Sequence, residues 1–161
     1  MIVDKFNFEI EEVLDSQRKA MVCEDILRSL PEWFGVEDAI KDYIEGVKDK
    51  CFFLAKVEEK VVGFLAIKDH NDHTSELYVM GILEGYHRKG IGKELIIITE
   101  ERLKGLGRKF FTVKTLGEGR ESEHYDRTRK FYSGIGFYPL EEFKELWDED
   151  NPCLFMVKSL G

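Results

Sequence analysis

The stretch from Ser75 to Leu95, SELYVMGILEGYHRKGIGKEL, decides the fold class and indicates what kind of ligand the protein binds. Its first residues have the pattern of a strand, and its last residues, from Gly90 onward, have the pattern of a helix. A helix that begins at glycines presents several backbone N–H groups at one point, and the helix dipole adds partial positive charge there. Such a helix start binds anions, so the stretch predicts a site for a phosphate-bearing cofactor.

Two common phosphate-binding motifs do not match this helix start. A P-loop has Ser or Thr after its lysine to bind magnesium, whereas Glu94 follows Lys93 here. The dinucleotide pattern G-x-G-x-x-G requires a glycine where this chain has Leu95. The sequence therefore argues against a nucleotide hydrolase and against a Rossmann dinucleotide site.

The composition describes one ordinary globular domain. With 161 residues, of which 43% are hydrophobic and 35% charged, the chain is long enough for a real core, and we expect a single domain over 1–161. No apolar run is long enough to cross a bilayer, and the N-terminus lacks the pattern of a secretion signal, so no membrane partner is expected. The 3 cysteines stand outside any C-x-x-C pair and predict reduced core thiols in a cytoplasmic protein.

Charge and ligand spacing argue against two further classes of partner. The net charge of −8 argues against a nucleic-acid partner, because such proteins need a cationic surface to displace counterions from phosphates. An acidic surface attracts a cationic substrate, although the same charge also serves simply to keep a protein soluble. His70 and His73, with Asp72 between them, lack further ligands at suitable spacing, so no metal site is predicted.

Hydrophobic spacing predicts a mixed α/β chain in which strands come before, between and after helices. Helices are expected within 13–30 and over 36–47, 90–106 and 125–133. Strands are expected near 2–8 and over 51–57, 61–67, 76–82, 110–116, 137–143 and 153–158, with a loop at 147–152. The helix over 90–106 should turn Ile91, Leu95, Ile98 and Leu106 inward.

Two blocks of the sequence resemble a known family. The block His87–Gly92, HRKGIG, is similar to motif A of the GNAT superfamily of N-acetyltransferases, written [Q/R]-x-x-G-x-[G/A]. The block Lys130–Phe137, KFYSGIGF, resembles the family's FY-x-x-x-GF block, and the order of elements matches over nearly the whole chain. The resemblance implies an α/β fold of the α+β type, with a mixed, mostly antiparallel central sheet flanked by helices. It also implies acetyl-CoA as the acyl donor, and no metal.

The resemblance implies which residues hold the cofactor. The backbone of Met80, Gly81 and Ile82 would pair with the pantetheine arm, as an exposed strand edge pairs with another strand. The turn and helix start would hold the pyrophosphate through His87, Arg88, Lys89, Gly90, Ile91, Gly92 and Lys93. Gly81 indicates either a close ligand or a large neighbour packed above the strand.

The implied cofactor site departs from the family pattern in three places. His87 stands where the family has Gln or Arg, and it either contacts phosphate or lies exposed in the turn. Tyr125 stands where many members have an Asn that meets the pantetheine, and Thr128 stands where they have Ala. The neighbouring cations Arg127, Arg129 and Lys130 either meet the 3′-phosphate or form a solvated helix face.

Two residues are predicted to catalyse acetyl transfer. Glu76 is the leading general base, since a carboxylate on an otherwise apolar strand is partly desolvated, and it matches the glutamate base of one family branch. The alternative is a strand-end carboxylate in water. Tyr132 matches the family's usual general acid, because a phenol is protonated at neutral pH and can donate to the CoA sulfur; alternatively it packs as a helix-end aromatic. By family analogy, the amide of Ile82 would meet the oxyanion.

The acceptor site is predicted from the aromatic connection after Pro31 and from a late loop. Trp33 and Phe34 either clasp the substrate or belong to the core. The acidic run 148–150 either draws in an amine or is solvated.

These observations predict an N-acetyltransferase that transfers an acetyl group from acetyl-CoA to a primary amine by direct attack in a ternary complex. The acceptor is a small-molecule or peptide amine that the sequence does not identify, and the family is compatible with a homodimer. The alternative is an acyl-CoA-binding sensor or scaffold that keeps the fold without transferring the acyl group.

Overall fold

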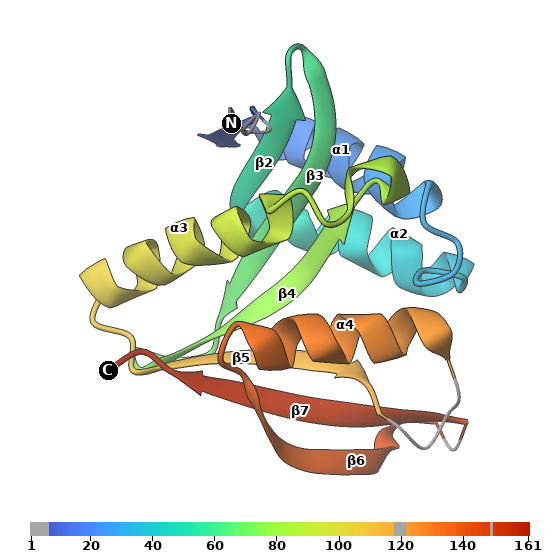
Figure 1. Cartoon of the computed structure of the whole chain (residues 1–161), viewed down its shortest axis with the longest axis vertical. Coiled ribbons are helices and arrows are strands. Elements are labelled where there is room, and N and C mark those ends of the chain that lie inside the picture. Colours follow the sequence, from blue (N-terminus) through green and yellow to red (C-terminus); the bar gives the residue numbers. More distant parts are fainter. Residues whose placement is uncertain (1–6, 118–121, 149) are drawn as a thin grey trace, which may run out of the picture. The chain divides into compact units, whose positions relative to one another are not determined.

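The computed structural model describes residues 7–117, 122–148 and 150–161, and the chain divides into two compact units (Figure 1). The first unit comprises Met1–Ile67 and Val79–Thr99, and the second comprises Lys68–Tyr78 and Glu100–Gly161. Strand β4 (Thr74–Ile82) and helix α3 (Ile91–Gly105) each contain residues of both units. That the whole chain behaves as a single domain stays a prediction.

The elements alternate as the hydrophobic pattern predicts. In chain order they are β1 (Glu9–Glu12), α1 (Ser16–Arg28), α2 (Glu37–Gly46), the 3₁₀ turn η1 (Val47–Asp49), β2 (Cys51–Val57), β3 (Lys60–Asp69), β4 (Thr74–Ile82), η2 (Glu84–Tyr86), α3 (Ile91–Gly105), β5 (Phe110–Leu116), α4 (Glu123–Gly134), β6 (Tyr138–Asp148) and β7 (Asn151–Ser159). The sheet has 7 strands in the order β1-β2-β3-β4-β5-β7-β6. The β4–β5 pair is parallel, and β1–β2, β2–β3, β5–β7 and β6–β7 are antiparallel. The predicted fold class is therefore confirmed.

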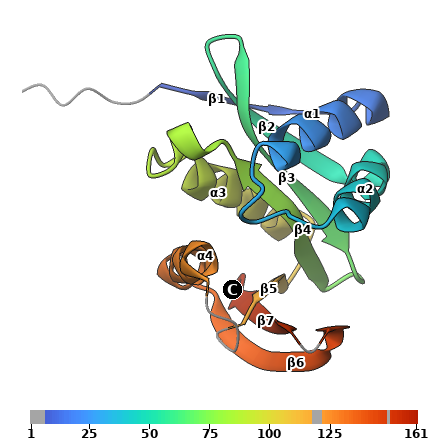
Figure 2. The same cartoon turned by 90° about the vertical axis from the view of Figure 1, so that its right-hand side faces the viewer.

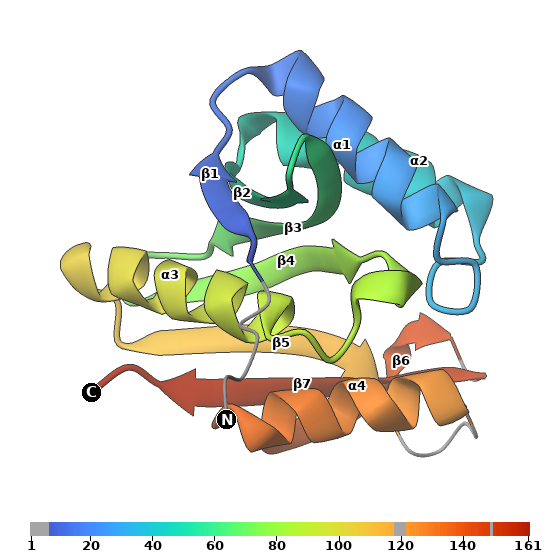
Figure 3. The ribbon, with the colours of Figure 1, turned by 45° about the horizontal axis from the view of Figure 1, so that its top comes forward.

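In the first unit, α1 and α2 lie side by side and on the same side of the β2–β3 hairpin (Figure 3). Helix α1 is capped by Asp15, whose carboxylate accepts a hydrogen bond from the backbone N–H of Arg18 at 3.3 Å. The middle of β3 is buried without alternation, as expected for a strand covered on both faces. Phe52 and Phe64 stack across the hairpin with ring centroids 5.2 Å apart.

In the second unit, α4 lies along β5 and β7 (Figure 1). The ring of Phe137, just after α4, packs against two others. Its centroid lies 5.3 Å from that of Phe111 on β5 and 5.7 Å from that of Tyr132. Strand β6 curves along β7 (Figure 2), and its pairing is shifted at two places, between Pro139 and Glu141 and again before Asp148. No helix in the described part of the chain has the length and apolar character needed to span a bilayer.

The structure corrects the predicted elements at three places. The first strand begins at Glu9, and most of the predicted range 2–8 lies outside the described residues. The loop predicted at 147–152 is wrong, because β6 continues to Asp148 and pairs there with Asn151 of β7. The inward position predicted for Leu106 is also wrong: α3 ends at Gly105, Leu106 is 54% exposed, and Ile96 and Leu103 fill the core beside Leu95.

Candidate functional site

The start of α3 has the backbone geometry of an anion site. The first helical hydrogen bond runs from the N–H of Glu94 to the carbonyl of Gly90 at 3.1 Å. The amides of the first turn, Ile91 to Lys93, therefore have no carbonyl acceptor within the helix. Gly90 has φ +84° and Arg88 has φ +61°, so the turn bends through left-handed backbone twice before the helix begins. A non-glycine residue with left-handed backbone, such as Arg88, costs about 1 kcal/mol of strain. Such strain is often found where the backbone is shaped to hold a ligand.

His87 points back toward the strand instead of outward. Its Nε2 atom lies 2.6 Å from the carbonyl oxygen of Ile82, and its ring meets Trp33 edge-on with centroids 5.5 Å apart. Because a carbonyl only accepts hydrogen bonds, Nε2 carries the proton and donates it. The side chain is half-buried and closes the turn onto the end of β4, so it is not the exposed turn histidine of the first alternative. A contact between its other ring nitrogen and phosphate stays a prediction.

Gly81 is explained by packing against α1. A Cβ atom at this position would lie 2.8 Å from Cγ2 of Ile26, 3.3 Å from Cδ1 of Leu30 and 3.4 Å from Cε1 of Phe64. The first distance is shorter than carbon atoms tolerate, so a large neighbour is sufficient to require glycine here. The pairing of Met80, Gly81 and Ile82 with pantetheine stays a prediction that this glycine does not test.

The predicted acceptor residues Trp33 and Phe34 are half-buried in the connection between α1 and α2. Both of their backbone N–H groups donate to the carbonyl of Leu30, at 3.1 and 2.9 Å, so the connection leaves α1 in a tight turn. The ring of Phe34 meets Tyr43 of α2 edge-on at 6.1 Å. The pair is therefore anchored on one side and accessible on the other.

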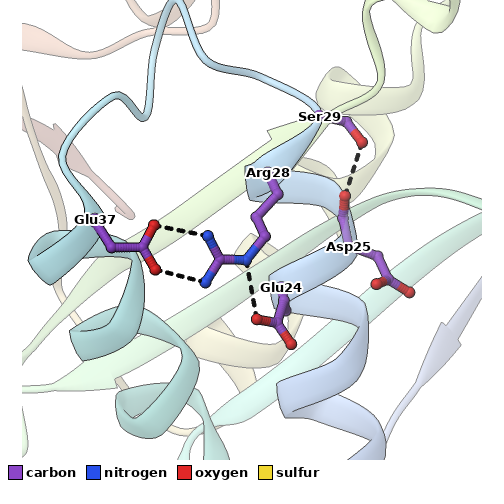
Figure 4. Close-up of polar contacts among 5 residues, drawn as sticks. All are labelled: Glu24, Asp25, Arg28, Ser29 and Glu37. Carbon is purple, nitrogen blue, oxygen red and sulfur yellow. Dashed lines mark hydrogen bonds and ion pairs between the residues drawn. The ribbon is translucent and has the colours of Figure 1, made fainter.

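An arginine bridges the two ends of this connection. Both terminal nitrogens of Arg28, at the end of α1, contact the carboxylate of Glu37, at the start of α2, at 2.8 Å (Figure 4). Its Nε also donates to Glu24 at 2.9 Å. Because these side chains are largely exposed, the ion pair adds little to the free energy of unfolding. Its bidentate geometry sets the distance between the end of α1 and the start of α2, which bounds the connection that contains Trp33.

In the second unit, Glu76 is a buried carboxylate with two cationic or titratable neighbours. The residue is 4% exposed, so it is not a strand-end carboxylate in water. Its Oε1 atom lies 2.6 Å from Nε2 of His70 and 3.3 Å from Nζ of Lys114. Glu76 pairs in register with Thr112 of β5, so both side chains and that of Lys114 lie on one face of the sheet. Lys114 and His70 are partners that sequence reasoning missed. The parallel register brings in Lys114 from β5, and the turn between β3 and β4 folds His70 back toward Glu76.

The loop that carries His70 is anchored independently of its imidazole. The backbone N–H of His70 donates to the carbonyl of Thr74 at 3.0 Å, and the side chain of Asn71 accepts from the N–H groups of His73 and Thr74. Arg108 donates to the hydroxyl of Ser75 at 3.1 Å and to the carbonyl of Asp72 at 3.1 Å. The backbone around His70 is therefore held by neighbours on both sides.

Tyr132, the predicted acid, lies on α4 and is 6% exposed. Its ring packs on Phe137, which in turn contacts Phe111 of β5, and thus lies on the sheet face opposite the one that carries Lys114 and Glu76. Glu76 and Tyr132 therefore lie on opposite faces of this part of the sheet, and their joint action on one substrate stays a prediction.

The remaining residues of α4 separate into cofactor candidates and a structural arginine. Tyr125 is half-buried in the first turn, and its N–H donates to the capping hydroxyl of Ser122 at 3.4 Å. Arg129 is buried and bonds the carbonyl of Leu116 and the carboxylate of Asp126. It is therefore committed within the fold, and only Arg127 and Lys130 remain exposed.

The last two groups are the metal ligands and the acidic run at 148–150. Within the described ranges 7–117, 122–148 and 150–161, no three His, Cys, Asp or Glu side chains are grouped so that they could hold a metal ion. Of the acidic run at 148–150, Glu149 lies outside the described residues and Asp150 is exposed.

Known proteins share both the sequence pattern and the fold. The chain is 26% identical over 133 residues to an uncharacterized N-acetyltransferase from Chlorobaculum tepidum, and the match covers 76% of this chain and 77% of the relative. A solved structure assigned to the GNAT acetyltransferases, from Desulfovibrio desulfuricans, matches with a TM-score of 0.82 at 14% identity, over 96% of this chain and 100% of the other. A GNAT family acetyltransferase from Elizabethkingia anophelis, solved with acetyl-CoA bound, matches with a TM-score of 0.72 at 15% identity, over 95% and 98%. The model of the acetyltransferase (GNAT) family matches residues 19–137, and this chain therefore belongs to that family.

Proposed function

We propose that this protein transfers an acetyl group from acetyl-CoA to a primary amine by direct attack within a ternary complex. Membership of an acetyltransferase family supports the reaction class, and a structural relative that holds acetyl-CoA supports the donor. The observation that carries the proposal is the buried Glu76 carboxylate on β4, the strand whose end leads through the His87 turn into the anion-binding start of α3.

The proposed cofactor contacts use backbone for the most part. The free amides of Ile91, Gly92 and Lys93 bind the pyrophosphate, and the exposed cations Arg88 and Lys89 add positive charge beside it. The backbone of Met80–Ile82 pairs with the pantetheine as in the family pattern, and Tyr125 lies beside it in place of the family's Asn.

The proposed chemistry assigns one role to each catalytic group. The lone pair of the neutral amine attacks the thioester carbonyl, and Glu76 takes the proton that the nitrogen loses as the C–N bond forms. The amide of Ile82 donates to the resulting oxyanion. As the intermediate collapses, the C–S bond breaks and Tyr132 gives its phenolic proton to the departing thiolate.

The acceptor is proposed as a small-molecule or peptide amine that lies against Trp33 and Phe34. A cytoplasmic location, a single domain and a homodimer through sheet edges complete the proposal. A thiol-release screen with acetyl-CoA against amines and peptides would identify the acceptor class.

Two variants test the residue roles. Glu76→Gln and Tyr132→Phe should each lower kcat by about 10² or more while CoA affinity, measured by calorimetry, stays unchanged. Normal turnover by both variants with the identified acceptor would refute the assignments. CoA binding by the wild-type protein, without thiol release over the whole panel, would favour the sensor or scaffold instead. Tight ATP binding with no response to CoA would point to a nucleotide-binding protein.

A further inference from the structure

We infer that His70 is a positioning residue, which aims the Glu76 carboxylate at the substrate. The inference rests on the proposed function, because it concerns the carboxylate that we assign as the base.

The first support is the way in which the two neighbours contact the carboxylate. The contacts from His70 at 2.6 Å and from Lys114 at 3.3 Å both end on Oε1 of Glu76. Two donors on one oxygen fix the rotation of the carboxylate group and leave Oε2 for the amine proton. A buried carboxylate needs such support, since a misaligned base loses most of its effect.

The second support is the difference between the two neighbours. Lys114 offers a flexible ammonium 3.3 Å from Oε1, whereas the imidazole of His70 is a rigid ring with Nε2 at 2.6 Å. The shorter contact from the rigid ring therefore sets the direction of the carboxylate more closely than the lysine does.

The third support is burial. The side chain of Glu76 is 6% exposed and that of His70 is 32% exposed, so the carboxylate depends on protein groups for its hydrogen bonds. The other charged or titratable groups near the pair are Lys114 on β5, Cys153 on β7, and Asp69, Asp72, His73 and Arg108 around the loop. Of these, only His73 is also a histidine, and it takes part in the loop's hydrogen bonds through its backbone.

The test uses His70→Ala, His70→Gln and the matched control His73→Gln in the full chain, with the acceptor identified by the thiol-release screen. Since backbone contacts hold the loop, all three variants should fold, which circular dichroism and CoA calorimetry would check. His70→Ala should lower kcat about tenfold or more at neutral pH, a part of what a general base contributes. His70→Gln keeps a donor near the position of Nε2, so it should restore most of that loss.

A comparison of kcat with KM separates positioning from a structural role. His70→Ala should lower kcat while the KM for acetyl-CoA stays close to the wild-type value, and His73→Gln should leave both unchanged.

Each result decides the question. If His70→Ala keeps wild-type turnover, or if His70→Gln recovers none of the loss, the positioning role is overturned while the proposed function stands. If the wild-type protein releases no thiol with any acceptor, the proposed function fails and the role of His70 fails with it.

Discussion

The Nε2 atom of His87 lies 2.6 Å from the carbonyl oxygen of Ile82, so the first residue of the HRKGIG turn is bonded back to the strand that precedes it. Because its partner is a carbonyl oxygen, Nε2 carries a proton in the neutral imidazole as well as in the charged one, and it donates in both forms. Its ring also packs edge-on against Trp33. One side chain therefore joins the end of β4, the turn before α3 and the aromatic connection between α1 and α2.

Replacing His87 should loosen the turn that carries the amides proposed to bind the cofactor. We expect His87→Ala to lower the free energy of unfolding by about 1 kcal/mol and to weaken CoA binding several-fold, because the turn loses its bond to Ile82. His87→Gln keeps a side-chain donor and should lie closer to wild type. Calorimetric titration with CoA measures the effect. Equal affinity in the wild-type protein and both variants would show that this bond does not support the turn.

The substitution Gly81→Ala adds one methyl group to β4 and should destabilise the protein. The new Cβ would lie 2.8 Å from Cγ2 of Ile26, so α1 or β4 must shift, at a cost of about 1–3 kcal/mol in denaturant unfolding. Gly85→Ala is the matched control, since no atom lies within 4 Å of the place that its new methyl group would take and its φ is not positive. Similar stability losses in both variants would contradict the packing explanation.

Two buried thiols should make the stability fall at alkaline pH. Burial raises the pKa of the Cys23 thiol to about 12, with a smaller contribution from Glu24, and burial raises the pKa of Cys153 to about 11. Above about pH 8.5 the unfolded chain releases these protons while the folded protein keeps them, so the unfolded state binds fewer protons. The free energy of unfolding should therefore fall as pH rises from about 9 to 11, by up to about 1.4 kcal/mol per pH unit for each thiol.

The variant Cys23→Ala tests the thiol assignment. It should make the fall between about pH 9 and 11 less steep, as measured by urea unfolding at several pH values. Val22→Ala, at the neighbouring buried position on α1, should lower stability without changing the slope, because it removes no titratable group. An identical slope in the wild-type protein and Cys23→Ala would refute the effect of Cys23.

A buried hydroxyl on β5 offers a stabilising substitution. Among the described residues, the hydroxyl of Thr115 is buried and has no hydrogen-bond partner. Thr115→Val replaces it with a methyl group of similar size, so the free energy of unfolding should rise by about 1 kcal/mol. Thr99→Val is the control and should bring no gain, since the Thr99 hydroxyl donates to the carbonyl of Leu95 at 2.8 Å. Thermal unfolding compares the two, and a loss of stability in Thr115→Val would show that its hydroxyl is paired in solution.

Local pattern was sufficient to predict the elements that position the site. The strand over 110–116 has the predicted bounds, the strand at 51–57 does too, and α3 begins one residue after the predicted Gly90. These predictions succeed because apolar spacing and glycine placement act within a few residues of one another. The ends of β6 and β7 inside the predicted loop were missed because they carry polar residues, which local apolar spacing does not mark as strand. Only the pairing of Asp148 with Asn151 identifies them as strand.

The direction and partners of the side chains depended on the whole fold. Sequence alone determined that a strand, a turn and a glycine-started helix follow one another from Ser75 to Leu95, and that the family is GNAT. The tertiary structure decided that Glu76 meets His70 and Lys114, that Gly81 lies beneath α1, and that Arg129 is committed to the carbonyl of Leu116. The physical reason is that periodicity records which face of an element is buried, whereas strand register and helix packing decide what each buried atom touches.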